Sequence, residues 1–266
     1  MNLFAREMRR NRTSFLIWIT AMIAVNAMVM ASFPSVAEMA KNTEAMLSQY
    51  PEEFVRAMNL DVLKMTNVLH FYASRSFLLS TIMGSVYAIM LSSCILSKEE
   101  NDHTIEFLLS KPLSRVSIVS SKTFSVLVYI TAFDVSFSAV NLVILNHFKL
   151  EDFSMKGFLL VSLGAWLIHL VFAFLGLTIS ATIPRTRTDI SVGLGIVFVG
   201  YFLSIVASLS DKLSFTKYLT PFSYFNTKDL VVNTTIEPLY LAITVVVCAS
   251  ATVFTYLYYK HKDIAA

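Results

Sequence analysis

The chain has 266 residues, of which 56% are hydrophobic and only 15% are charged, against roughly 25% charged in an average soluble domain. Its net charge of +3 is too small to indicate a nucleic-acid partner. A soluble core does not need so many hydrophobic residues, whereas a surface that faces lipid does. The composition therefore predicts one membrane domain over residues 1–266, without a large soluble domain.

Six apolar runs are long enough to cross a bilayer as helices, because about 20 residues are needed for the hydrocarbon region. In chain order they are 15–33, 77–96, 124–145, 158–183, 190–209 and 239–258. The runs lack the alternating pattern of a lipid-facing barrel, and helices satisfy their own backbone groups. We predict an all-α, polytopic membrane protein with six transmembrane helices.

The distribution of lysine and arginine predicts which ends of the spans face the cytoplasm. With the N-terminus inside, the short inner segments carry Arg6, Arg9, Arg10, Arg12, Lys98, Lys111, Arg115, Lys122, Arg185, Arg187, Lys260 and Lys262. An even number of spans then places both termini in the cytoplasm. A cleaved signal peptide is the competing interpretation, but the run 15–33 exceeds the 7–15 residues of a signal.

Two segments outside the spans have their own predicted structure. Residues 1–14 place Phe4 and Met8 on one helix face with arginines around the rest, which favours an interfacial helix over a frayed basic tail. Residues 34–76 form the longest polar stretch, which we expect to be an outer loop. Spacings of three and four predict an amphipathic helix in it, with its apolar face on Val55, Met58, Val62 and Met65.

The inner segment 97–123 has the pattern of a short helix with an exposed apolar ridge, formed by Ile105, Leu108 and Leu109. Asp102 can cap this helix, Pro112 ends it, and Ser114 can begin the next one. Such a ridge needs a partner surface. The alternatives are that it lies on the membrane or folds under its own helical bundle.

This segment resembles the signature loop of ABC-2-type transporter permeases. That loop shows a glutamate, then Gly-Thr-Leu-Glu-x-Leu-Leu, then Pro-x-Ser-Arg. The corresponding residues here are Glu99, Thr104-Ile105-Glu106-Phe107-Leu108-Leu109 and Pro112-Leu113-Ser114-Arg115. His103 stands where the family usually has glycine. The resemblance extends to the chain length, the six spans and the run 219–225 between the last two.

The resemblance implies that this loop is a coupling helix, which inserts into a groove on a separate ATPase subunit. The implied coupling residues are Glu99, Glu100, Asp102, Thr104, Ile105, Glu106, Leu108, Leu109, Pro112 and Arg115. Among them Glu99 and Glu106 would be polar contacts, and Leu108 and Leu109 apolar anchors. The sequence has no G-x-x-x-x-G-K-[ST] loop, so ATP and Mg would bind to the partner subunit and no cofactor to this chain. The family also implies a second permease copy, identical or different, in a bacterial cell membrane.

Several polar residues fall inside the predicted spans, where they are costly unless paired. Asp134 has three interpretations: a structural hydrogen bond, a cavity-lining group, or a proton relay with His169 as the second member. Asn26 and Asn141 are expected to hydrogen-bond between helices. If the second span lines the central path, as the family implies, Ser85 and Ser92 could line it together with Asp134.

We find no H-E-x-x-H or G-x-S-x-G motif, and we predict no catalytic residue, no metal site and no enzymatic activity of this chain alone. The expected function is that of the permease subunit of an ATP-driven exporter for a hydrophobic or amphipathic compound, such as an antimicrobial peptide or drug. The alternative is an ATP-independent, ion-coupled transporter or a membrane assembly factor.

Overall fold

The computed structural model describes residues 3–47, 65–102, 114–183, 186–209 and 211–262, and these residues form helices and connecting turns without a strand. Among them, six helical stretches are long and apolar enough to cross a membrane. They are Leu3–Lys41, Val68–Ser93, Arg115–Phe148, Met155–Thr182, Thr188–Ala207 and Pro238–His261. Each overlaps one predicted span, so the all-α polytopic architecture is confirmed.

The first span is longer than predicted. Helix α1 (Leu3–Ala31) continues into α2 (Phe33–Leu47) through a bend at Ser32. Pro34 lies in the first turn of α2, where its missing N–H costs no helical hydrogen bond. The expected break between an interfacial helix at 1–14 and the span is absent, because α1 is continuous. The position of its first turns relative to lipid stays a prediction.

The second span begins well before Phe77. Asn67 caps α4 (Val68–Phe71) by accepting a hydrogen bond from the Leu69 N–H at 3.0 Å. The π-helical turn η1 (Tyr72–Ser76) then joins α4 to α5 (Phe77–Ser93). The predicted outer loop 34–76 is therefore helical at both ends. The amphipathic helix expected around Val55, Met58 and Val62 lies outside the described residues.

Helices α8 (Arg115–Phe148) and α9 (Met155–Thr182) both start at serine caps. After α6 (Lys98–Asn101), α8 begins where the Ser114 Oγ accepts from the Ser117 N–H at 3.1 Å, as predicted. Helix α9 begins in the same way at Ser154. Such caps satisfy backbone donors that have no partner inside the helix.

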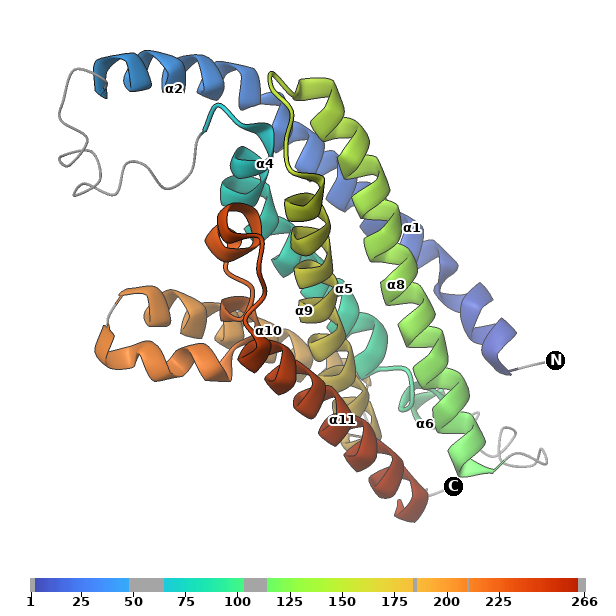
Figure 1. Cartoon of the computed structure of the whole chain (residues 1–266). Helices are drawn as coiled ribbons and strands as arrows, with labels where there is room; N and C mark the ends of the chain where they lie inside the picture. Colours follow the sequence, from blue (N-terminus) through green and yellow to red (C-terminus); the bar gives the residue numbers. More distant parts are fainter. Residues whose placement is uncertain (1–2, 48–64, 103–113, 184–185, 210, 263–266) are drawn as a thin grey trace.

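Short helices connect the last two spans. Helix α10 (Thr186–Leu209) is followed by η2 (Asp211–Leu219), η3 (Pro221–Ser223) and η4 (Asp229–Asn233), and then by α11 (Pro238–His261). Segment η2 folds back beside α10 (Figure 1). The Thr220 Oγ1 donates to the Gly200 carbonyl at 2.7 Å, which fastens this return to α10.

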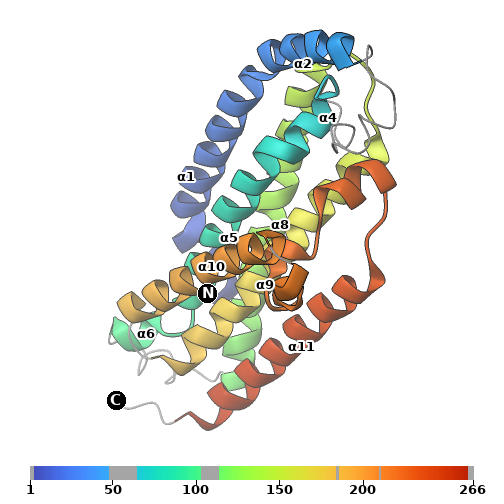
Figure 2. The same cartoon turned by 90° about the vertical axis from the view of Figure 1, so that its left-hand side faces the viewer.

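Helix α9 lies at the centre of the bundle, packed against α5, α8, α10 and α11 (Figures 1 and 2). Its contact with α5 depends on small residues, since a Cβ at Gly176 would lie 2.0 Å from the Ser92 Oγ. Both termini and α6 lie at one end of the molecule, called here the α6 end; the other is the α2 end (Figure 1).

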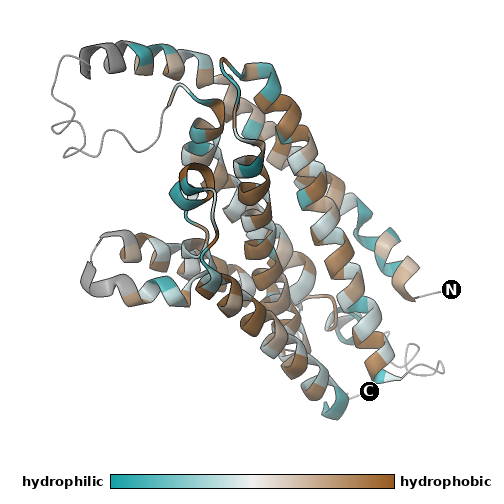
Figure 3. Ribbon diagram, in the orientation of Figure 1, coloured by the Kyte–Doolittle hydropathy of each residue, from teal (hydrophilic) through white to brown (hydrophobic). Residues whose placement is uncertain are grey.

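The outer helices expose large apolar side chains. Hydrophobic colour runs along α8, α9 and α11, and hydrophilic colour is more frequent toward both ends of the molecule and on the connection from α10 to α11 (Figure 3). Ile17 on α1, Phe202 on α10 and Val246 on α11 are each more than 60% exposed. Side chains of this kind are stable against lipid or against another apolar helix, which agrees with a membrane protein.

Candidate functional site

The chain from α5 to α6, which leads into the predicted coupling loop, is fixed to the ends of α9 and α10. The Ser180 Oγ of α9 accepts hydrogen bonds from the backbone N–H groups of Leu96 at 2.8 Å and Ser97 at 3.2 Å. The Ser97 hydroxyl donates to the Asp189 carboxylate of α10. The start of the loop therefore has a defined position relative to two spans.

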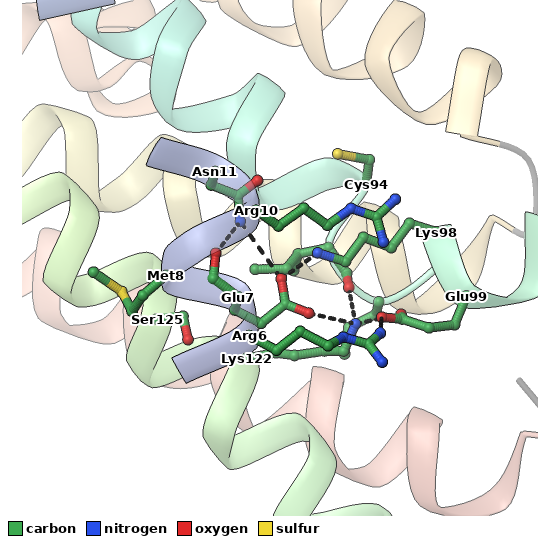
Figure 4. A network of polar contacts seen from close by, with 12 residues as sticks. Arg6, Glu7, Met8, Arg10, Asn11, Cys94, Lys98, Glu99, Lys122 and Ser125 are labelled. Atoms are coloured by element: carbon green, nitrogen blue, oxygen red, sulfur yellow. Dashed lines mark hydrogen bonds and ion pairs between the residues drawn. The ribbon is translucent and has the colours of Figure 1, made fainter. Parts of the chain in front are cut away.

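A set of charged side chains then links α6 to α1 and α8. This buried ion cluster consists of Arg6, Glu7, Lys98, Glu99 and Lys122 (Figure 4). Lys98 pairs with Glu7, Lys122 pairs with Glu99, and Arg6 pairs with Glu99 at 3.0 Å. The Lys122 Nζ also lies 3.6 Å from the second Glu7 oxygen. Three helices thus meet at one set of alternating charges.

Four of the five members of the cluster are shielded from solvent, and the fifth, Arg6, is partly exposed. Glu7, Glu99 and Lys122 have 0% of their surface exposed, and Lys98 has 6%. A buried charge is costly without its partner, so each member depends on the others staying in place. Lys122 also donates to the Ile95 carbonyl at the end of the second span. A displacement of α6 would therefore break several contacts together rather than one at a time.

Further contacts surround the cluster at the α6 end. Arg10 of α1 pairs with Asp102 at 2.8 Å, where both side chains are more than 40% exposed. Lys262, just beyond α11, pairs with Glu100 of α6 at 2.8 Å. Arg115, at the start of α8, donates to the Lys260 carbonyl at 3.3 Å. Both ends of the loop are thereby joined to the end of the last span.

The predicted coupling residues divide into two groups. Glu99, Glu100, Asp102 and Arg115 are described, and all four bind the chain to itself. Glu99 was expected to be a polar contact of an ATPase, but it is buried between Lys122 and Arg6. Asp102 follows α6, and the helix that it was expected to cap lies outside the described residues. So do Thr104, Ile105, Glu106, Leu108, Leu109 and Pro112.

The sequence interpretation missed Glu7, Lys98 and Lys122 as parts of this site. Two signals could have pointed to them. Glu7 is the one acid among the four arginines of the first 14 residues. Lys122 lies next to the third apolar run, where a cation needs either the interface or a partner. The sequence does not reveal that Glu7 and Lys122 lie next to each other in the fold.

A second polar pair lies inside the bundle. The His169 Nδ1 of α9 lies 2.8 Å and 3.1 Å from the two Asp134 oxygens of α8, and His169 is completely buried. The imidazole packs directly on α5, since a Cβ at Gly84 would lie 2.2 Å from its Nε2. This geometry agrees with the structural interpretation of Asp134. It also supplies the second titratable group that a proton relay requires.

The other polar residues predicted within the spans are also buried between helices. The Asn26 amide of α1 donates to the Asn141 carbonyl oxygen of α8 at 3.1 Å, which confirms that both residues hydrogen-bond between helices. Ser85 and Ser92 of α5 are both 0% exposed, and Ser92 donates to the Ala88 carbonyl of its own helix. Their place on a translocation path stays a prediction.

One known protein family matches almost the whole chain. The family model described as ABC-2 family transporter protein matches residues 1–264, which include the buried ion cluster and all six spans. A search of curated proteins finds no match.

Proposed function

Since the chain belongs to the ABC-2 family of transporter proteins and is a membrane permease of ABC-type transport, we propose that it is the permease subunit of an exporter. Its substrate would be a hydrophobic or amphipathic compound, such as an antimicrobial peptide or drug. The energy would come from ATP, bound with Mg²⁺ and hydrolysed on the separate ATPase subunit. This chain would supply the path and the mechanical connection.

The buried ion cluster is the observation that carries this proposal. The segment 103–113, which contains six of the implied coupling residues, follows Lys98 and Glu99 by only a few residues in the sequence. Those two side chains pair with Glu7 of α1 and Lys122 of α8. A force applied to the loop by a partner would reach two spans through paired charges that cannot separate cheaply.

The contacts around the cluster extend the same connection. Ser97 and Glu100 link the loop to α10 and to the end of α11. In our proposal, closure of the ATPase subunits moves the loop, and the spans follow as rigid bodies between inward-open and outward-open states. The inward-open and outward-open states would share the same buried ion pairs and differ in the contacts of α1 and α10 with neighbouring helices.

The orientation and the assembly follow from the same proposal. The α6 end would lie in the cytoplasm of a bacterial cell, together with both termini, because an ATPase that meets ATP must contact the loop there. Two permease copies, identical or different, would form the complete path. Helices α1 and α10 each expose several large apolar side chains, which suit a contact with another apolar helix.

One substitution in the permease, compared with a matched control substitution, tests the coupling to the ATPase. The complex is purified in mild detergent with whichever ATPase is bound to it, and ATP hydrolysis is measured with wild-type permease and with Leu108→Asp. The charge should abolish hydrolysis that depends on the permease, because it removes an apolar anchor from the loop. The matched control is Leu150→Asp, which places the same charge on an exposed leucine at the α2 end.

Three results would overturn the proposal: no ATPase bound to the wild-type chain, unchanged coupling in Leu108→Asp, or equal loss in both variants. The permease variants are compared only where both elute as folded particles. Identification of any compound retained during the same purification would reveal the substrate class.

The Asp134–His169 pair supports a second candidate, an ion-coupled transporter without an ATPase. Two titratable side chains in contact within the membrane can hold and release a proton. This function requires transport that follows an imposed proton gradient in vesicles without ATP, and loss of that transport in Asp134→Asn. Transport that needs ATP and persists in Asp134→Asn would exclude it.

A further inference from the structure

A cleft opens near the α2 end, between the second span and the connection from α10 to α11. It has a volume of about 570 Å³ and is lined by η1 and the first turns of α5 on one side. The last turns of α10, the short helices η2 to η4 and the start of α11 form the other sides. Sites for drug-sized molecules have volumes of about 300–1,000 Å³. The cleft is thus large enough to bind a compound rather than a few waters.

The lining combines an apolar surface with charged groups. Phe77 and Leu78 of α5 and Phe222 of η3 provide apolar contact area. The charged members are Asp229, Glu237 and Lys217, so carboxylates outnumber amines by two to one. Apolar walls with a few polar groups are typical of sites that bind an amphipathic molecule.

The charged side chains of the cleft are available to a ligand. Within the described residues, neither Glu237 nor Lys217 forms an ion pair with another side chain. Asp229 accepts one hydrogen bond, from the Asn233 amide at 2.8 Å, and this neutral donor leaves its charge uncompensated. The cleft therefore offers net negative charge beside its apolar wall.

An aromatic group completes the lining. The Tyr240 ring lies at the cleft and stacks on Tyr224, with ring centroids 5.4 Å apart and planes inclined by 12°. This stack fixes the orientation of the Tyr240 ring. A cation beside an aromatic face is attracted by the negative potential of the ring face, and more strongly when the cation is desolvated.

We propose that this cleft binds lipophilic cations, with the apolar part of the ligand on Phe77, Leu78 and Phe222 and its positive charge near Asp229 and Glu237. Only the role of the cleft in transport rests on the proposed function: in an exporter the cleft would be the outward-facing site from which the substrate leaves. The binding itself requires neither the ATPase nor a particular direction of transport.

Two probes of the same shape and opposite charge test the inference. Tetraphenylphosphonium and tetraphenylborate are titrated against the full chain in nanodiscs of phosphatidylcholine, and the signal of empty nanodiscs is subtracted. We expect saturable binding of the cation and none of the anion. In Asp229→Asn/Glu237→Gln the affinity for the cation should fall about tenfold.

Two further variants separate a charge effect from structural damage. Lys217→Gln should strengthen binding of tetraphenylphosphonium, a gain that misfolding cannot produce. Glu151→Gln removes an exposed carboxylate from the connection between α8 and α9, outside the cleft, and should change nothing. Equal binding of both probes, or unchanged affinity in the double variant, would overturn the inference.

The outcome is independent of the exporter proposal. If the cation binds as predicted but no ATPase accompanies the chain, the site stands and the exporter proposal fails. If an ATPase is coupled but the double variant binds the cation as well as wild type does, the exporter proposal stands and the site is refuted.

Discussion

Replacing Lys122 by methionine is the sharpest test of the buried ion cluster. Methionine keeps the length and most of the volume of the side chain but removes its charge. Glu7 and Glu99 then share one helix junction with one buried cation fewer, although Lys98 and Arg6 remain beside them. The variant therefore measures the role of the central cation, not of the packing around it.

The expected loss follows from the geometry. At the 3.6 Å that separates the Lys122 Nζ from Glu7, and an effective dielectric constant of 20, two unit charges attract by about 4–5 kcal/mol. Removing one partner of a buried pair costs about 3–5 kcal/mol in measured cases. The remaining cations compensate part of this, so we expect a loss of about 3 kcal/mol in the free energy of unfolding.

The assay is thermal unfolding of the purified chain in detergent, followed by size-exclusion chromatography. For chains of about this size, 1 kcal/mol corresponds to roughly 2–4 °C, so the midpoint should fall by about 6–12 °C. Lys149→Met is the matched control, because Lys149 pairs with Asp152 on the exposed α8–α9 connection; its midpoint should not change measurably.

The double variant Lys122→Met/Glu99→Gln tests whether the charge is responsible. Removing the facing carboxylate as well should restore part of the loss, with a coupling energy of about 0.5–3 kcal/mol. A midpoint for Lys122→Met within 2 °C of wild type would refute the reasoning. So would losses in the single variants Lys122→Met and Glu99→Gln that simply add in the double variant. The cluster would then be a set of contacts without energetic weight.

Two other predictions concern the bundle. Gly84→Ala places a Cβ 2.2 Å from the His169 ring and should cost about 1–3 kcal/mol in the same assay. Gly195→Ala, with no atom within 4 Å, should cost nothing and gain up to about 1 kcal/mol from helix propensity; equal midpoints would contradict the close approach at Gly84. Asn26→Leu and Asn141→Leu should each lose about 0.6 kcal/mol, and at most about 1.7, with little further loss when combined; fully additive effects would show that their hydrogen bond contributes nothing.

The sequence was sufficient to predict the number and type of the spans, because hydrocarbon thickness fixes how many apolar residues a helix needs. It was less informative about where the helices end. The second span begins at Val68 and not at Phe77, since polar residues continue a helix when tertiary contacts satisfy them. Asp134 and His169 interrupted two apolar runs, and their pairing explains how both remain inside the bundle.

The site was predicted only in part. Local spacing identified the cap at Ser114, which depends on neighbouring residues alone. The helix expected after Asp102 stays a prediction. The cluster could not be found in this way, because Glu7, Lys98 and Lys122 come from three distant segments. Glu99 was assigned to an external partner, since nothing in its own neighbourhood reveals an internal cation.

The burial of Glu7 also has a consequence for biogenesis. This carboxylate belongs to α1, which leaves the ribosome before α6, because Lys98, its nearest partner, follows 91 residues later. At about 5–20 residues per second, the gap lasts roughly 5–20 s. During that interval the acid must stay hydrated or protonated, so α1 cannot form its final contacts at Glu7 until Lys98 has been made. Truncated chains that end before Lys98 should therefore be poorly anchored at this point and favoured targets of membrane proteases.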